Sequence, residues 1–182
     1  SENIQLTITD QPADPSLTAS DMTICLGETI TLFGTNYNVG TSGAASYNWS
    51  GDGITGNPQT STVSVTPTTA GSQVYNYSVT IAGCTSTVGT VTVSVEDAPV
   101  ITGVGTASDI TCLDGTTNVT LNATVTGAVS TVWSGPNGYS STSVNAVIVD
   151  ASSANNGTYT LTATSSNGCM STATFNLSVT DQ

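Results

Sequence analysis

Short segments in which apolar and polar residues alternate run along the whole chain. Examples are Thr29–Leu32, Val63–Val65 and Leu161–Ala163. Clusters of Gly, Pro, Asn and Asp separate these segments at intervals of roughly ten residues. Alternation with period two is the pattern of a half-buried β-strand, and no stretch carries apolar residues at helical spacing. The pattern predicts an all-β chain of antiparallel β-sandwiches, with about seven short strands in each.

The same features occur twice, in residues 22–97 and again in residues 109–181. The stretch "YNWSGDG" of the first copy corresponds to "TVWSGPNG" of the second, and "STVSVTP" corresponds to "SVNAVIV". Self-similarity at a fixed period indicates tandem structural repeats. The sequence therefore predicts one domain at residues 16–97 and a second at residues 98–182, with residues 1–15 as a leading strand and linker.

The leading segment repeats the last strand of the chain. "NIQLTITDQ" (residues 3–11) matches "TFNLSVTDQ" (residues 174–182) at Leu6/Leu177 and again at the terminal "TDQ". This indicates that the segment is the final strand of a preceding unit or a strand donated to a neighbour. The residues of the donated strand would be Asn3, Ile4, Leu6 and Ile8. The alternative is an extra first strand of the first domain, although residues 16–25 already supply one.

Four aromatic residues are the candidate core. Trp49 and Trp133 occupy the expected third strand of each repeat, and Tyr77 and Tyr159 open the expected sixth strand. The stretch "DASSANNGTYTL", which leads to Tyr159, resembles the corner before the sixth strand of an immunoglobulin-like domain.

Residues 16–181 resemble the immunoglobulin-like and PKD-like repeats of long secreted surface proteins of Bacteroidota, including gliding adhesins and extracellular filaments. The motifs that carry the resemblance are "ICLGETITL", "YNWSGDG" and "YSVTIAGCTST", with their counterparts in the second repeat. The "WDFGDG" of PKD domains is replaced by "WSGDG", which favours the immunoglobulin-like branch. The resemblance implies a two-domain sandwich at the cell surface or outside the cell, with an adhesive or structural role.

The charge of the chain is entirely negative. Its 182 residues include no Lys, Arg or His and 12 Asp plus Glu, which gives a net charge of -12. Nothing can neutralise phosphates, so the composition excludes nucleic acid as a partner and steering onto an anionic membrane. No apolar run reaches the roughly 20 residues of a membrane span. Without His or Lys there is no ordinary nucleophile–base pair, so we expect no enzyme activity.

The four cysteines occur as two per repeat, Cys25 and Cys84, then Cys112 and Cys169. In an exported β-protein disulfides are expected, and without His or a CxxC pair metal binding is the weaker interpretation. In an immunoglobulin-like topology the two cysteines of one repeat fall at opposite ends of a strand about 20 Å long, too far for a bond. Cys25 would then join Cys169, and Cys84 and Cys112 would join neighbouring units. If the strand order differs, Cys25–Cys84 and Cys112–Cys169 are the expected pairs.

Carboxylates gather at the predicted domain junctions. Such oxygen-rich clusters suit Ca²⁺, which takes six to eight oxygen ligands, although solvated turns carry the same residues. The candidate calcium ligands are Asp10, Asp14, Glu28, Glu96, Asp97 and Asp114. No other cofactor is indicated.

These features favour a structural repeat of an extracellular filament or giant cell-surface adhesin, which assembles with copies of itself through strand complementation and disulfides. The alternatives are a module that binds a glycan or another surface ligand, on a host or prey cell, and a non-catalytic spacer of a secreted protein. Exposed aromatic residues near Tyr37, Tyr47 or Tyr139 would support the binding module.

Overall fold

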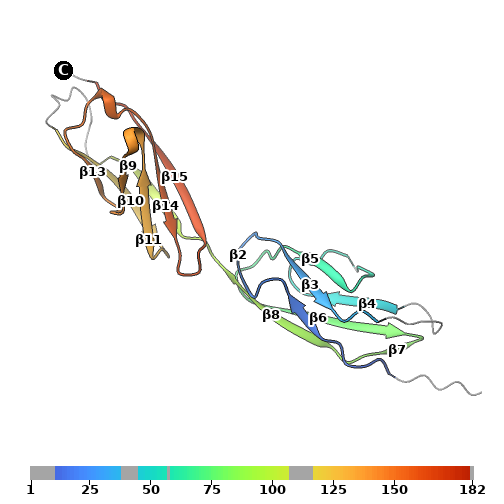
Figure 1. The fold of residues 1–182 in the computed structure, drawn as a ribbon. Coiled ribbons are helices and arrows are strands. Elements are labelled where there is room, and N and C mark those ends of the chain that lie inside the picture. Colours follow the sequence, from blue (N-terminus) through green and yellow to red (C-terminus); the bar gives the residue numbers. More distant parts are fainter. Residues whose placement is uncertain (1–10, 38–44, 57, 107–116, 181–182) are drawn as a thin grey trace, which may run out of the picture. The chain divides into compact units, whose positions relative to one another are not determined.

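The computed structural model describes residues 11–37, 45–56, 58–106 and 117–180. The chain divides into two compact units, Ser1–Glu96 and Asp97–Gln182, which are called domain 1 and domain 2 below. Each is built almost entirely of β-strands (Figure 1), as the alternating pattern predicts. The predicted all-β, immunoglobulin-like fold class is confirmed.

Domain 1 is a sandwich of two sheets. One sheet has the order β1 (Leu17–Ala19), β3 (Ile30–Gly34) and β5 (Thr62–Val65). The other has the order β2 (Thr23–Cys25), β8 (Gly89–Glu96), β6 (Gly71–Ile81) and β4 (Ala45–Ser50), and the short β7 (Cys84–Thr85) also pairs with β6. Inward-facing residues of both sheets form one core, which includes Leu32, Val65, Tyr77 and Val93.

The first strand of domain 1 divides between the two sheets. The sequence indicates one strand over residues 16–25, but β1 pairs antiparallel with β3 and β2 pairs parallel with β8. Leu17 and Ile24 are both buried in the core, so each half of the segment contributes one apolar anchor to its own sheet. As a result, β2 lies on the edge of β8 and ends at Cys25.

Domain 2 has the same architecture. One sheet has the order β13 (Ala146–Ile148), β10 (Val119–Thr126) and β9 (Val100–Thr106). The other has the order β12 (Ser140–Ser141), β11 (Ser130–Ser134), β14 (Gly157–Thr164) and β15 (Met170–Leu177). Two short 3-10 turns, η1 (Pro136–Gly138) and η2 (Ser153–Asn155), lie in its loops.

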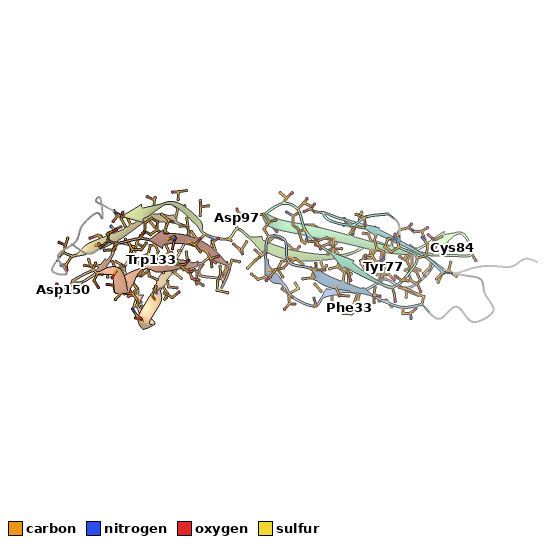
Figure 2. The ribbon with its side chains drawn as sticks, turned by 90° about the horizontal axis from the view of Figure 1, so that it is seen from above. Phe33, Tyr77, Cys84, Asp97, Trp133 and Asp150 are labelled. Carbon is orange, nitrogen blue, oxygen red and sulfur yellow. The ribbon has the colours of Figure 1, made fainter. Side chains whose placement is uncertain are left out.

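A buried tryptophan joins the two sheets of each domain. Trp49 on β4 is 7% exposed and Trp133 on β11 is 0% exposed. The indole Nε1 of Trp49 donates to the Thr60 carbonyl at 2.9 Å, and that of Trp133 donates to the Val144 carbonyl at 3.0 Å. In both domains the acceptor lies 11 residues after the tryptophan. The shared spacing shows that the two repeats use the same core interaction; Figure 2 shows Trp133 within its own domain.

The structural counterpart of Tyr159 is Tyr75, not Tyr77. A Cβ on Gly51 would overlap the Tyr75 ring, and a Cβ on Gly135 would overlap the Tyr159 ring. Tyr77 is also buried, but it lies opposite Trp49 with ring centroids 4.4 Å apart. The predicted equivalence of Tyr77 with Tyr159 was therefore wrong by two residues in this strand.

The two equivalent tyrosines differ in their hydrogen bonding. The Tyr159 hydroxyl donates to the Asn155 carbonyl at 2.9 Å, which is the tyrosine corner of an immunoglobulin-like sandwich. The Tyr75 hydroxyl is buried without a hydrogen-bond partner among the described residues. Burial, and to a smaller extent the charge of Asp52, raises the pKa of the Tyr75 phenol. Among the described residues, domain 1 thus keeps the buried tyrosine ring of the tyrosine corner but lacks the hydrogen bond of its hydroxyl.

The glycine of "WSG" is required by the tyrosine ring packed against it. We expect Gly135→Ala to lower the free energy of unfolding of domain 2 by about 1–3 kcal/mol, because the added methyl group forces the Tyr159 ring to move. Denaturant unfolding monitored by tryptophan fluorescence measures the change. The matched control is Gly105→Ala in β9 of the same domain, where an added Cβ meets nothing within 4 Å. An equal loss in both variants would contradict this account.

Candidate functional site

The two cysteines of domain 1 lie at opposite ends of the longest strand. Cys25 is the register partner of Glu96 on β8. The residue before Glu96, Val95, pairs with Gly71, so Cys25 lies near the start of β6. Cys84 is the register partner of Ile81 at the end of β6. These ends are separated by the 11-residue length of β6, which is about 30 Å. A disulfide requires Cα atoms within about 7 Å, so this register is incompatible with a Cys25–Cys84 bond inside domain 1.

The chain reaches domain 1 at the end that carries Cys84. Gln11 Nε2 donates to the Thr85 carbonyl at 2.9 Å, and the Thr87 hydroxyl donates to Asp14 Oδ1 at 2.6 Å. The Tyr37 hydroxyl donates to the Ala13 carbonyl. The chain leaves domain 1 after Glu96, beside Cys25, at the opposite end from Cys84 (Figure 2). We call these the incoming end and the outgoing end of the domain.

In domain 2, Cys169 lies at the incoming end. It precedes β15 in a tight hairpin, where its carbonyl accepts from the Ser165 N–H at 2.9 Å. The chain enters domain 2 at Val100, the first residue of β9, which pairs with Thr126 at the end of β10. A short turn leads from there to Ser130 on β11, which pairs with Thr164 at the end of β14. The hairpin that carries Cys169 follows Thr164 and therefore lies at the end where the chain enters. Cys169 is buried, and both it and Cys25 are disulfide-bonded. Cys112 lies outside the described residues.

The donated-strand residues Asn3, Ile4, Leu6 and Ile8 lie outside the described residues. What the structure does describe is how the segment that follows them is held. Pro15 passes so close to β8 that a Cβ on Gly89 would lie 2.6 Å from the Pro15 carbonyl oxygen. Together with the contacts of Gln11 and Asp14, this fixes the segment along the edge of domain 1 as it arrives at the incoming end.

The calcium candidates that the structure describes are spread over the domain. Asp14 lies at the incoming end, whereas Glu28 and Glu96 lie at the outgoing end. Glu28 Oε2 accepts from the Cys25 N–H at 2.9 Å, and Glu96 Oε1 accepts from the Ser94 hydroxyl at 2.7 Å. Across residues 11–37, 45–56, 58–106 and 117–180, no three acidic or cysteine residues come together as a metal site would need. Asp10 and Asp114 lie outside these ranges, and calcium binding stays a prediction.

Asp52, in the "SGDG" turn, has a structural partner. Its carboxylate accepts from the Thr68 N–H at 2.6 Å, the Thr68 hydroxyl at 2.7 Å and the Thr69 N–H at 2.9 Å. The hydroxyl bond from Thr68 is the largest cause of the lowered pKa of Asp52. In domain 2 the corresponding tie is Asn137 Nδ2, which donates to the Ala154 carbonyl at 2.7 Å. Asp52 therefore holds the loop before β6 rather than facing a cleft.

The candidate aromatic residues do not form an exposed cluster. Tyr47 is 8% exposed, and its hydroxyl donates to Asn36 Oδ1 at 3.0 Å. Tyr37 and Tyr139 are half-buried against the cores of their own domains, and the hydroxyl of Tyr139 donates to the Val147 carbonyl at 3.1 Å. The loops of either domain thus offer no stacking platform from these three residues.

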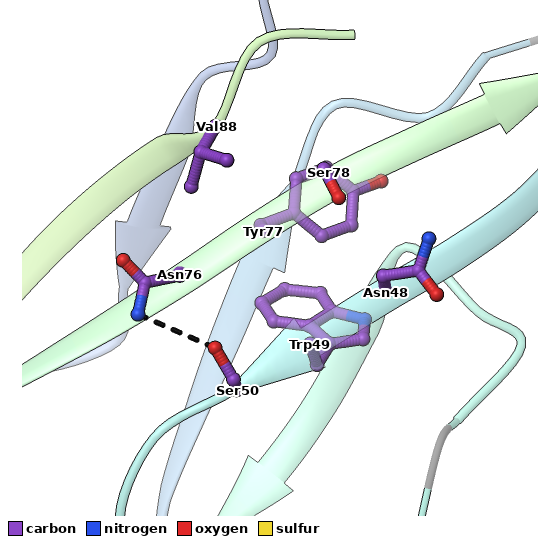
Figure 3. A pocket seen from close by; sticks show the side chains of 7 residues that line it. All are labelled: Asn48, Trp49, Ser50, Asn76, Tyr77, Ser78 and Val88. Carbon is purple, nitrogen blue, oxygen red and sulfur yellow. Dashed lines mark hydrogen bonds between the residues drawn. The ribbon is translucent and has the colours of Figure 1, made fainter. Parts of the chain in front are cut away.

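The described residues form at least two shallow hollows on the surface. One, of about 150 Å³, is on the outer face of β4 and β6 (Figure 3) and is lined by Asn48, Trp49, Ser50, Asn76, Tyr77, Ser78 and Val88. The other, of about 190 Å³, is lined by Val125, Ala128, Val129, Ser130, Thr131 and Val144 in domain 2. Neither contains a carboxylate, so neither has the residues for hydrolytic acid–base chemistry. The first hollow could not be predicted from the sequence, because its polar residues look like ordinary solvent-facing strand positions.

Comparison with known proteins supports the fold. No family model matches the chain, and no curated protein matches it. Among solved structures it is similar to the D1–D4 ectodomain fragment of ICAM-5, with a TM-score of 0.58 and 15% identity, over 96% of this chain and 48% of that one. It is also similar to a C-terminal fragment of intimin in complex with the intimin-binding domain of its receptor Tir, with a TM-score of 0.52 and 16% identity, over 97% and 65%.

The chain spans about half to two thirds of the length of these two structures. At such low identity the likeness establishes the tandem immunoglobulin-like fold and no more. Within the described residues, no helix has the length and apolar character needed to cross a membrane.

The Asp52 bonds predict a pH dependence of stability. A folded-state pKa below the ordinary value of 3.8 means that the stabilisation is complete above that value and is lost as the pH falls through the lowered pKa. We expect Asp52→Asn to lower the thermal midpoint of domain 1 at neutral pH, and the difference from the unmodified chain to shrink in acid. Circular dichroism melts from neutral pH downward measure this. The control Asp21→Asn, which removes an exposed carboxylate of the same domain, should leave the thermal midpoint at neutral pH close to that of the unmodified chain.

Proposed function

We propose that this chain is a structural repeat unit of an extracellular filament or giant cell-surface adhesin, of the kind found in Bacteroidota, and that it assembles head to tail. The observation that carries the proposal is the position of the cysteines of domain 1. One lies at the end where the chain arrives and the other at the end where it leaves, about 30 Å apart along β6. Cysteines placed in this way serve links between successive domains rather than the core of one domain.

In this assembly Cys25 joins Cys169 across the junction between the two domains. Cys25 belongs to the outgoing end of domain 1, and Cys169 belongs to the incoming end of domain 2, which follows it in the chain. Both are disulfide-bonded, which supports the pairing. Cys84, at the incoming end of domain 1, takes the role of Cys169 toward the preceding unit. Its partner is the Cys112 of that unit.

Strand complementation adds a second link. Leu6 and Ile8 align with Leu177 and Val179, which are 1% and 3% exposed in the core of domain 2. A donated strand therefore carries apolar residues at the spacing that the final strand of a domain uses to close its core. Gln11 and Asp14 are held against domain 1, and a fixed attachment point reduces the entropy lost when a strand next to it binds a neighbour.

The composition and the structural neighbours fit an exposed location. The absence of Lys and Arg removes every site for trypsin-like proteases. One neighbour is an ectodomain fragment and the other is a fragment bound to its receptor domain, so tandem sandwiches of this form occur in recognition outside the cell. The self-partner, the extracellular location and the absence of catalytic chemistry all belong to this proposal.

Disulfide mapping of non-reduced protein tests the proposal. Cleavage at Asp and Glu places each cysteine on its own peptide, because acidic residues bracket all four. We expect the Cys25 peptide joined to the Cys169 peptide within one chain, because the β2–β8 register brings Cys25 to the outgoing end. We also expect the Cys84 peptide joined to the Cys112 peptide of another chain. Non-reducing electrophoresis should show a ladder of multimers that reductant collapses.

Two serine variants separate the links. Cys84→Ser should abolish the ladder and retain the Cys25–Cys169 bond, whereas Cys25→Ser should retain the ladder. Recovery of Cys25–Cys84 and Cys112–Cys169 would show self-contained domains, and the filament proposal would fail in favour of a spacer or an isolated binding module.

A further inference from the structure

The hollow on the outer face of domain 1 has a regular polar floor. Asn48 lies opposite Ser78 across the β4–β6 ladder, and Ser50 lies opposite Asn76, so each amide has a hydroxyl beside it. All four side chains lie on the face opposite the core residues Trp49 and Tyr77 (Figure 3). The Asn76 Nδ2 donates to the Ser50 hydroxyl at 3.3 Å, whereas the Asn48 amide makes no hydrogen bond in the described part of the chain.

The hollow exists because β8 begins only at Gly89, so the residues just before it do not pair with β6 as part of that strand. The β6–β8 ladder starts at the pair Tyr77–Gly89, and before it Ser86 bonds to Val79 through both its N–H and its hydroxyl. The connection from Ser86 to Val88 therefore departs from the sheet. Val88 remains 59% exposed and forms one wall of the hollow (Figure 3).

From this arrangement we infer that the hollow binds a neutral sugar residue. An unpaired asparagine amide presents a donor and an acceptor side by side, which matches two adjacent hydroxyl groups of a pyranose ring. The hydroxyls of Ser50 and Ser78 donate or accept as required, and the exposed Val88 side chain packs against the C–H groups of the ring. The volume of about 150 Å³ accommodates one ring rather than an oligosaccharide.

The charge of the protein selects against acidic sugars. The hollow is lined by no charged residue, and the chain has a net charge of -12 with no cation to pair with a carboxylate. A uronic or sialic acid would meet only repulsion. The site is shallow and open, so we expect a dissociation constant on the order of 1 mM, with useful avidity arising only where many copies are joined.

Chemical-shift titration of the isotope-labelled full chain tests the inference. The probes are the methyl glycosides of glucose, galactose and mannose, with glucuronic acid as the acidic comparison. At least one neutral glycoside should shift the amide signals of residues 48–50, 76–78 and 88 with saturation, and glucuronic acid should not. Shifts from none of the three glycosides, or equal shifts from glucuronic acid, would overturn the site.

Side-chain variants locate the contact. Asn48→Ala and Asn76→Ala should each weaken binding by about tenfold, because each removes hydrogen bonds to the ring. The matched control is Asn176→Ala, an exposed asparagine on β15 of domain 2, which should bind the glycoside unchanged. Both Asn48 and Asn76 face outward, and the spectrum of each variant reports whether the fold is retained. Undiminished binding by both hollow variants would place the sugar elsewhere and contradict the inference. None of these outcomes depends on disulfide pairing or on filament formation.

Discussion

The hydrogen-bonded pairing of β6 with β8 is the constraint on which the rest of domain 1 depends. It runs from Gly71–Val95 to Tyr77–Gly89, and β6 continues beyond it to Ile81. Because β2 pairs with the end of β8 and β7 pairs with the far end of β6, Cys25 and Cys84 lie at opposite ends of domain 1. The late start of β8 also opens the hollow beside Val88. The ends and the outer face are thus consequences of one register.

In the part of the chain that the structure describes, hydrogen bonds take the place of ion pairs. Without Lys, Arg or His, no carboxylate has a side-chain cation as partner, and loops are fastened by neutral donors. Asp52 draws on Thr68 and Thr69, and Asn137 serves the same purpose in domain 2 with an amide instead. A hydrogen bond to a carboxylate contributes more to stability than one between neutral groups. The Asp52 bonds therefore make the stability of domain 1 depend on pH, whereas the Asn137 bond does not have this effect in domain 2.

Much of the fold could be predicted because period-two alternation survives in nearly every strand. The core role of the two tryptophans could also be predicted, because "WSG" occurs at the same place in both repeats and a repeated motif indicates repeated packing. The division of residues 16–25 was missed, although Leu17 and Ile24 are both buried and lie an odd number of residues apart, so the alternation changes phase between them, where the chain passes from one sheet to the other. The equivalence of Tyr75 and Tyr159 was hidden by the two tyrosines that share one face of β6.

The candidate site was harder to predict than the fold, for a physical reason. Core positions are constrained by packing, whereas an outward Asn or Ser is compatible with plain solvation as well as with binding. Asn48 and Ser78 are 30 residues apart in the sequence and meet only through the β4–β6 register. The hollow next to them needs the interruption at Ser86, which no local pattern encodes.

The position of the acidic residues bears on the proposed head-to-tail assembly. The described strand interiors carry no acidic residue, whereas Asp14 lies at one end of domain 1 and Glu28 and Glu96 lie at the other. Head-to-tail contact brings like charges together, at about 1 kcal/mol per close pair in water, and salt screens this beyond about 8–10 Å. Electrostatic repulsion therefore opposes stacking by surface contact alone at the ends that the proposed assembly brings together. The proposed covalent bond and inserted strand would overcome that repulsion, because neither depends on the ends attracting one another. An anionic repeat with such links would join end to end while its like charge keeps chains from associating at random.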